Sequence, residues 1–301
     1  MKTNHKQPPV NLSNPFCTAL FAVFVLVLPI SGLALADNIF VANGGNYTIE
    51  KFDSSGHGSV FANLGSSQPQ GLAFDNSGNL YTANGGNTIV KFDSSGHGSV
   101  FANSGLIAPT GLAFDSSGNL YAANYLGNTI EKFSPTGTDL GAFANSGLNQ
   151  PAGLAFDDSG NLYAANYLGN TIEKFDSSGH GTLFANSGLS RPMGLAFDDN
   201  GNLYAANFGN GTIEKFDSSG NGTLFANPGL IAPFGLAFDS SGNLYVANAG
   251  NNTIEKFDSS GHGSIFANSG LSGPTYIAIQ TPEPATLLLL TLGGLTVLRK
   301  R

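Results

Sequence analysis

The sequence predicts an all-β protein, a six-bladed β-propeller with four strands in each blade. Three observations predict this fold: a repeat of about 41 residues, four strand-like segments within each repeat, and an order of segments that closes a ring. The composition agrees, because the 301 residues include 41 glycines and only 11% are charged. Such a chain favours many short strands joined by tight turns.

The repeat consists of GLAF, then NLYxAN, then TIxKF, then FAN. The last three phrases each occur six times, the first NLYxAN as NIFVAN from Asn38. A decayed sixth copy of GLAF, the YIAI that begins at Tyr276, follows 41 residues after the fifth. The phrase GLAF itself begins at Gly71, Gly111, Gly153, Gly194 and Gly235.

The first two segments predict strands that are packed on both faces. Alternation places the Leu and Phe of GLAF on one face and the Ala on the other, and NLYxAN places its Tyr opposite its Leu. Four-stranded units with two apolar faces, about 40–45 residues long, are what a propeller stacks into a ring. A solenoid is the rival architecture, and it would need distinct capping units at its ends.

The connections between the strands predict hairpins. The DxSG and DSSGHG turns place Gly where a positive φ is needed, and their Asp favours an Asx turn. Calcium binding by these Asp residues is the weaker alternative, since calcium takes 6–8 oxygen ligands. In TIxKF the Glu and Lys face opposite sides, which predicts a solvated outer strand and not an acid/base pair.

The two ends of the repeat region predict closure of the ring. The repeats begin with a second strand, NIFVAN, and end with a lone first strand, YIAI. Together these two segments complete one sheet, which gives six blades and leaves no unpaired strand. The predicted propeller therefore spans residues 37–281.

Residues 1–36 have the layout of a secretory signal peptide. Lys2 and Lys6 precede an apolar run, and a small-x-small pattern ends at Ala36, so cleavage by signal peptidase is expected between Ala36 and Asp37. A retained transmembrane helix is less favoured, because the apolar run is short for a span. The only cysteine, Cys17, would leave with this peptide, so the mature protein is predicted to have no disulfide.

Residues 282–301 contain the triplet Pro282, Glu283 and Pro284, an apolar run, and a basic end at 299–301. This order at the extreme C-terminus resembles the PEP-CTERM sorting signal of Gram-negative bacteria. The resemblance implies export, processing by an exosortase, and transient membrane anchoring of the precursor through the apolar run. It also implies an exopolysaccharide or biofilm context.

The repeat units resemble NHL repeats, whose family fold is the six-bladed propeller. The resemblance covers almost all of residues 37–281. One departure is that the family commonly has Asp where this chain has the second Asn of NLYxAN, as at Asn124. Any family function that relies on a carboxylate there is not expected here.

Charge and the placement of the histidines narrow the function. Residues 37–281 contain 7 Lys and Arg and 19 Asp and Glu, a net charge of 7 − 19 = −12. This charge argues against nucleic-acid binding, which needs clustered cations. His57, His97, His180 and His262 all occupy the same turn of different repeats, so they cannot converge on one metal ion. No metal, other cofactor or catalytic residue is predicted.

Positions that vary between repeats are the candidates for binding, since invariant positions are explained by the blade. They lie just before GLAF and just after NLYxAN, on one face of the predicted ring. We predict an aromatic, sparsely charged patch that suits a neutral sugar face or an apolar peptide; the alternative is that these residues only cap the blade edges. The candidate residues are Arg191, Met193, Phe234, Tyr125, Tyr167 and Phe208.

The function predicted from the sequence is that of an exported, non-enzymatic propeller at the cell surface or outside the cell. Its expected ligand is a neutral polysaccharide or a surface protein of an extracellular matrix. The first alternative is a propeller enzyme that resembles gluconolactonases or streptogramin lyases, which gather unlike catalytic groups at the central channel. The second is a purely structural repeat protein without a ligand.

Overall fold

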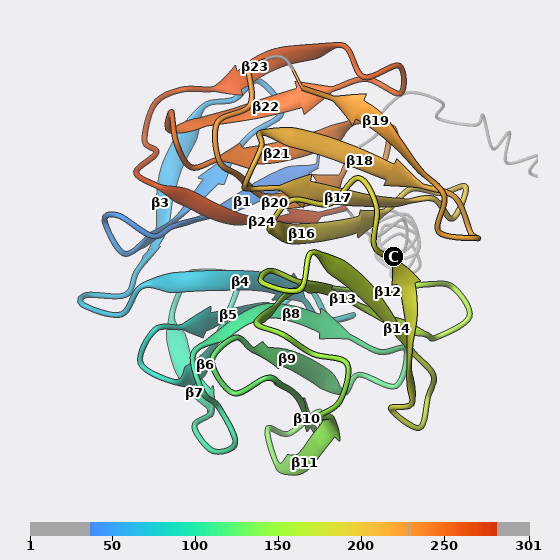
Figure 1. The fold of residues 1–301 in the computed structure, drawn as a ribbon. Helices are drawn as coiled ribbons and strands as arrows, with labels where there is room; N and C mark the ends of the chain where they lie inside the picture. The colour runs from blue at the N-terminus through green and yellow to red at the C-terminus, as the bar shows by residue number, and fades with distance from the viewer. Residues whose placement is uncertain (1–36, 228, 282–301) are drawn as a thin grey trace, which may run out of the picture. The chain divides into compact units, whose positions relative to one another are not determined.

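The computed structural model describes residues 37–227 and 229–281, which form six sheets of four antiparallel strands each. The sheets are arranged around a common axis as the blades of a propeller (Figure 1). The predicted signal peptide and the sorting segment lie outside these residues. Within the described ranges, no helix has the length and apolar character that crossing a membrane requires.

The strands follow the four phrases of the repeat. Each blade is numbered by its place in the chain, and each first strand extends two residues before its GLAF to a proline. Blade 1 consists of β24 (Pro274–Gln280), β1 (Asn38–Asn43), β2 (Thr48–Phe52) and β3 (Gly58–Asn63). Blade 2 consists of β4 (Pro69–Phe74), β5 (Leu80–Asn84), β6 (Thr88–Phe92) and β7 (Gly98–Ala102). Blade 3 consists of β8 (Pro109–Phe114), β9 (Leu120–Asn124), β10 (Thr129–Phe133) and β11 (Asp139–Ala144).

The remaining three blades repeat this order. Blade 4 consists of β12 (Pro151–Phe156), β13 (Leu162–Asn166), β14 (Thr171–Phe175) and β15 (Gly181–Ala185). Blade 5 consists of β16 (Pro192–Phe197), β17 (Leu203–Asn207), β18 (Thr212–Phe216) and β19 (Gly222–Ala226). Blade 6 consists of β20 (Pro233–Phe238), β21 (Leu244–Asn248), β22 (Thr253–Phe257) and β23 (Gly263–Ala267).

The predicted closure of the ring is confirmed in blade 1. β24 pairs antiparallel with β1, with Ile39 opposite Ile279 and Val41 opposite Ile277. The last strand of the described residues, β24, thus provides the innermost strand of the sheet that also contains β1, and the edge of β1 is paired instead of open.

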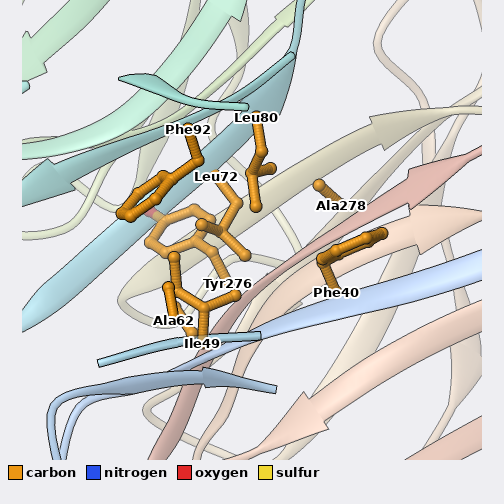
Figure 2. Packing of buried hydrophobic residues seen from close by; sticks show 9 residues of the cluster. Phe40, Ile49, Ala62, Leu72, Leu80, Phe92, Tyr276 and Ala278 are labelled. Carbon is orange, nitrogen blue, oxygen red and sulfur yellow. The ribbon is translucent and has the colours of Figure 1, made fainter. Parts of the chain in front are cut away.

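The blades pack face to face through the two apolar faces of each sheet. Between blades 2 and 3, Tyr81 and Ile89 of one sheet meet Leu112 and Phe133 of the other. Figure 2 shows the equivalent cluster between blades 1 and 2, where Ile49 and Ala62 of blade 1 lie near Leu72 of blade 2. Four of the five tyrosines of NLYxAN also pack edge-on against two phenylalanines, which adds about 0.5–1.5 kcal/mol for each pair. Tyr81, for example, lies 5.0 Å from Phe101 and 4.9 Å from Phe114.

The DxSG turns form the hairpins that the sequence predicts. In blade 2, Gly78 has a φ of 76° and its amide donates to the Asp75 carbonyl at 2.9 Å. The Asp75 carboxylate accepts the amides of Ser77 and Asn79, both at 2.9 Å, which is an Asx turn. Burial alone would raise the pKa of Asp75, but these bonds and those from the side chains of Asn79 and Tyr81 lower it overall.

The prediction that TIxKF is a solvated strand is wrong for its glutamate. The Glu side chains are buried in blades 1, 3, 5 and 6, and Glu131 is only 7% exposed. The loop that enters each blade covers this position, since a Cβ on Gly105 would lie 3.0 Å from Glu131 Cγ. The lysine faces the other side, where Lys91 Nζ lies 3.4 Å from the Asp75 carboxylate and 5.2 Å from the Tyr81 ring centre.

The buried Glu131 makes stability depend on pH. Burial and the negative charge of nearby Asp139 raise the pKa of Glu131 to about 7, above its usual 4.5. Folding therefore favours the protonated acid, and stability is expected to fall as the pH rises from about 4.5 to 7. Glu131→Gln should remove this loss. The free energy of unfolding of the variant, relative to that of the wild type, should therefore be about 3 kcal/mol higher at pH 8 than at pH 4, at roughly 1.4 kcal/mol for each unit of pKa.

Urea unfolding of the two proteins between pH 4 and pH 8 measures this difference. Glu173→Gln is the matched control, because burial also raises the pKa of Glu173 but no second carboxylate adds to the effect. We expect a smaller gain in the control. A Glu131→Gln protein whose stability follows the wild-type pH profile would contradict the assignment.

Candidate functional site

One cavity of about 330 Å³ opens at the face where the first strand of every blade begins, which we call the mouth face. The opposite face carries the DxSG turns, and we call it the turn face. Residues from five blades line the cavity, so it lies over the axis of the ring. Its volume falls within the range of ordinary small-ligand pockets.

Aromatic rings line one half of this cavity as a continuous arc. The ring centres of Tyr125 and Tyr167 lie 5.7 Å apart, and those of Tyr167 and Phe208 lie 6.1 Å apart. Phe208 in turn lies 5.9 Å from Phe234, at an interplanar angle of 89°. We call these four residues the aromatic arc; they come from blades 3, 4, 5 and 6. Side chains of blades 2 and 3 line the other half, among them Gln68, Gln70 and Thr110.

The backbone explains why the loop residues point to the axis. The first residue of the loop after each second strand donates its amide to the carbonyl of the residue just before the proline that starts the first strand of the same blade. That residue has a positive φ in every blade except blade 2. Thus the amide of Tyr125 donates to the Ala108 carbonyl at 3.1 Å, and that of Phe208 to the Arg191 carbonyl at 3.3 Å. Ala108 and Arg191 have the same φ of 49°. The fold fixes the backbone at these positions, so the side chain there is free to vary.

Two further predicted residues lie beside the arc. Arg191 is exposed at the rim, with its guanidinium carbon 5.8 Å from the centre of the Tyr167 ring. Such a contact with an aromatic face is worth about 0.5–1 kcal/mol at an exposed site. Met193 also lines the cavity and is only 4% exposed. The structure therefore brings all six predicted residues to one site, five as lining residues and Arg191 at the edge.

Sequence reasoning missed Tyr276, which continues the arc. Its ring lies 5.6 Å from that of Phe234, and its hydroxyl is buried without a hydrogen-bond partner in the described part of the chain. Burial raises the pKa of Tyr276, and burial also raises that of Tyr125 with a smaller contribution from Tyr167. Both hydroxyls thus remain protonated donors at neutral pH. The available signal was that Tyr276 stands where the other five repeats have Gly.

The other polar groups that the sequence singled out lie away from this cavity. His57 and its three counterparts are exposed in turns of the turn face, where His57 Nδ1 lies 3.8 Å from the Asp53 carboxylate. The turn carboxylates such as Asp75 already accept protein hydrogen bonds. Across residues 37–227 and 229–281, no group of three His, Cys, Asp or Glu side chains is placed to hold a metal ion.

Comparison with known proteins identifies the C-terminal segment. Residues 280–301 match the PEP-CTERM protein-sorting motif. This motif indicates an exported protein of Gram-negative bacteria whose C-terminus is processed by an exosortase. No protein of curated function is similar enough in sequence to count as a relative.

Solved structures show the same fold at low sequence identity. A chain of a nidogen/laminin complex superposes with a TM-score of 0.74 at 21% identity, over 81% of this chain and 98% of that one. Virginiamycin B lyase from Staphylococcus aureus superposes with a TM-score of 0.64 at 17% identity, over 81% of this chain and 88% of the lyase. A catalytically inactive histidine-to-alanine variant of that lyase with quinupristin gives 0.59 at 16% identity, over 80% and 78%. These likenesses establish a shared propeller fold and nothing about activity.

Proposed function

We propose that the exported protein binds a neutral polysaccharide at its mouth cavity, at the cell surface or in the surrounding matrix, without catalysing a reaction. The aromatic arc is the observation that carries this proposal. Pyranose rings present a face of C–H groups that stacks on aromatic side chains, while their hydroxyls need polar partners. Gln68, Gln70 and Thr110, opposite the arc, are suited to bind those hydroxyls.

Charge supports a neutral ligand over an acidic one. None of the described residues that line the cavity is charged. Arg191, at the rim, is the one cation near the arc in the described part of the chain. The net charge of −12 for residues 37–281 repels anionic polymers unless cations bridge the two. An apolar peptide is the competing ligand, but the amide and hydroxyl groups of the cavity favour the sugar.

The positions of the chain ends fit presentation of this face away from a membrane. Asp37 lies at the turn face, where its carboxylate accepts the amide of Ser240 at 2.9 Å. β24 also ends there, because the Gln280 side chain donates to the Gly78 carbonyl at 3.3 Å. A precursor held through the segment after residue 281 would therefore direct its mouth face outward.

The decisive binding experiment uses variants whose new residue already occurs in another blade. Phe234→Ala introduces the residue that blade 4 has at the equivalent position, Ala152. Arg191→Ala introduces the residue that blade 3 has at the equivalent position, Ala108, whose φ is the same as that of Arg191. In a glycan array followed by titration calorimetry, we expect the double variant to bind the selected polysaccharide at least tenfold more weakly, a loss of about 1.4 kcal/mol.

Leu168→Ala is the matched control. Leu168 is 52% exposed in a loop next to Tyr167 but does not line the cavity, so its truncation should leave affinity unchanged. Equal affinity of the double variant and the wild type would refute the mouth as the binding site. If the wild-type protein binds no neutral glycan in the array, the proposed function itself is refuted.

A lyase or lactonase activity is the alternative that the shared fold with virginiamycin B lyase suggests. Such chemistry needs an acid or base at the channel, and the groups that line this cavity in the described residues are amides, hydroxyls and apolar side chains. Turnover of a lactone and ester panel by the purified protein, lost in Tyr125→Phe, would favour the enzyme over the binding protein.

A further inference from the structure

Blade 2 contains a second cavity, of about 360 Å³, far from the axis. It lies against the outer strands β6 and β7 of this blade and under residues 64–67, which belong to the loop that enters the blade from blade 1. Thr88, Val90 and Asn84 line it from the sheet, and Leu64 and Ser67 line it from the loop.

A single substitution within the repeat explains this cavity. Position 90 is Val, whereas the other five blades have Glu at the equivalent position. In those blades the glutamate fills the space under the entering loop: a Cβ on Gly188 of the blade 5 loop would lie 2.7 Å from Glu214 Oε1. In blade 2, a Cβ on Gly65 would meet no atom within 4 Å. The shorter side chain of Val90 leaves the volume open.

The same cavity is lined by a residue with an unsatisfied polar atom. Asn84 is 2% exposed, and its Oδ1 has no hydrogen-bond partner in the described structure. In blade 3 the equivalent Asn124 Oδ1 accepts the amide of Ile107 at 2.9 Å. In blade 2 the equivalent amide, that of Ser67, donates instead to the Leu64 carbonyl at 3.3 Å. A buried acceptor without a donor costs about 1–3 kcal/mol, which a ligand hydroxyl can recover.

We propose that this cavity is a second binding site, for one uncharged sugar unit. The described lining contains no charged side chain, so an ionic ligand would lose its hydration without an ion pair. A sugar hydroxyl donates to Asn84 Oδ1, and other hydroxyls bond to Thr88 and Ser67. Val90 and Leu64 cover the C–H face of the ring. This site is separate from the mouth cavity, and the proposal does not depend on what the mouth cavity binds.

The test replaces Val90 by the residue of the other blades. Val90→Glu refills the cavity with a side chain that five blades accommodate, so the fold should be kept; Val90→Leu fills it without adding charge. Saturation-transfer NMR with methyl hexosides and N-acetylhexosamines, in the Phe234→Ala and Arg191→Ala background, isolates this site from the mouth. We expect both variants at position 90 to weaken binding at least tenfold.

The proposal fails on any of three results. The first is that no probe binds the mouth-deficient protein at millimolar concentration. The second is that binding persists unchanged in Val90→Glu and Val90→Leu. The third is that a crystal soaked in the best probe shows only ordered waters at Asn84. Variants at Phe234 and Arg191 should lose binding at the mouth and keep binding at the second cavity, and variants at Val90 should do the opposite; this difference separates the two sites.

Discussion

A chain that ends at Gly273 should fail to form the propeller, whereas a chain that ends at Thr281 should form it. The shorter chain lacks β24, so blade 1 keeps three strands and β1 gains an open edge. The buried Val41 and Ile39 lose their partners Ile277 and Ile279, and the ring loses the strand that lies between β20 and β4. We expect a loss of more than about 5 kcal/mol, which is the entire stability of many domains.

Circular dichroism and thermal unfolding of the two chains measure this effect. The longer chain should show one cooperative transition, and the shorter one should show none. A synthetic peptide of residues 274–281, added in excess, should restore part of the transition, because the missing strand pairs through its backbone. A shorter chain that unfolds at the wild-type temperature would mean that β24 does not close the ring.

The architecture was predictable because local sequence features specify each part of it. Alternation, turn residues and the period are properties of each repeat, and closure follows from the order of the segments at the two ends. The burial of Glu131 was not predictable in this way. Alternation tells which side of a strand a residue faces, but not that a loop from the preceding blade covers that side.

The candidate site was predictable only as far as variation among the repeats reveals it. Comparison of repeats identified the aromatic arc because the blade itself does not require aromatic rings at those positions. The same comparison shows Val90 as an exception, but the cavity depends on what fills the space in the other blades. Tyr276 was missed because its segment was interpreted only as a decayed copy of GLAF. The position of its side chain next to Phe234 depends on the closure of the ring of blades by β24.

Gly153→Ala should destabilise the protein by about 3 kcal/mol, the upper end of the usual cost of overpacking, and lower its Tm by about 10 °C. Gly153 lies in β12, next to β16, and a Cβ there would come within 2.2 Å of the Met193 carbonyl oxygen and 2.9 Å of the Leu195 amide nitrogen. Both atoms belong to backbone, which cannot move aside as a side chain would. The two inner strands must therefore separate, and the blades with them.

Gly85→Ala is the matched control, since a Cβ there would lie no closer than 3.6 Å to any atom and Ala249 occupies the equivalent position in blade 6. Its Tm should stay within about 2 °C of the wild type, as for a substitution that costs less than 0.5 kcal/mol. Because the Met193 side chain lines the mouth cavity, separation of β12 from β16 should also reduce binding there. Equal stability of the two variants would show that the inner strands can accommodate a methyl group. The glycine at the third position of the first strand in blades 2 to 6 would then not be required by the close approach of these strands.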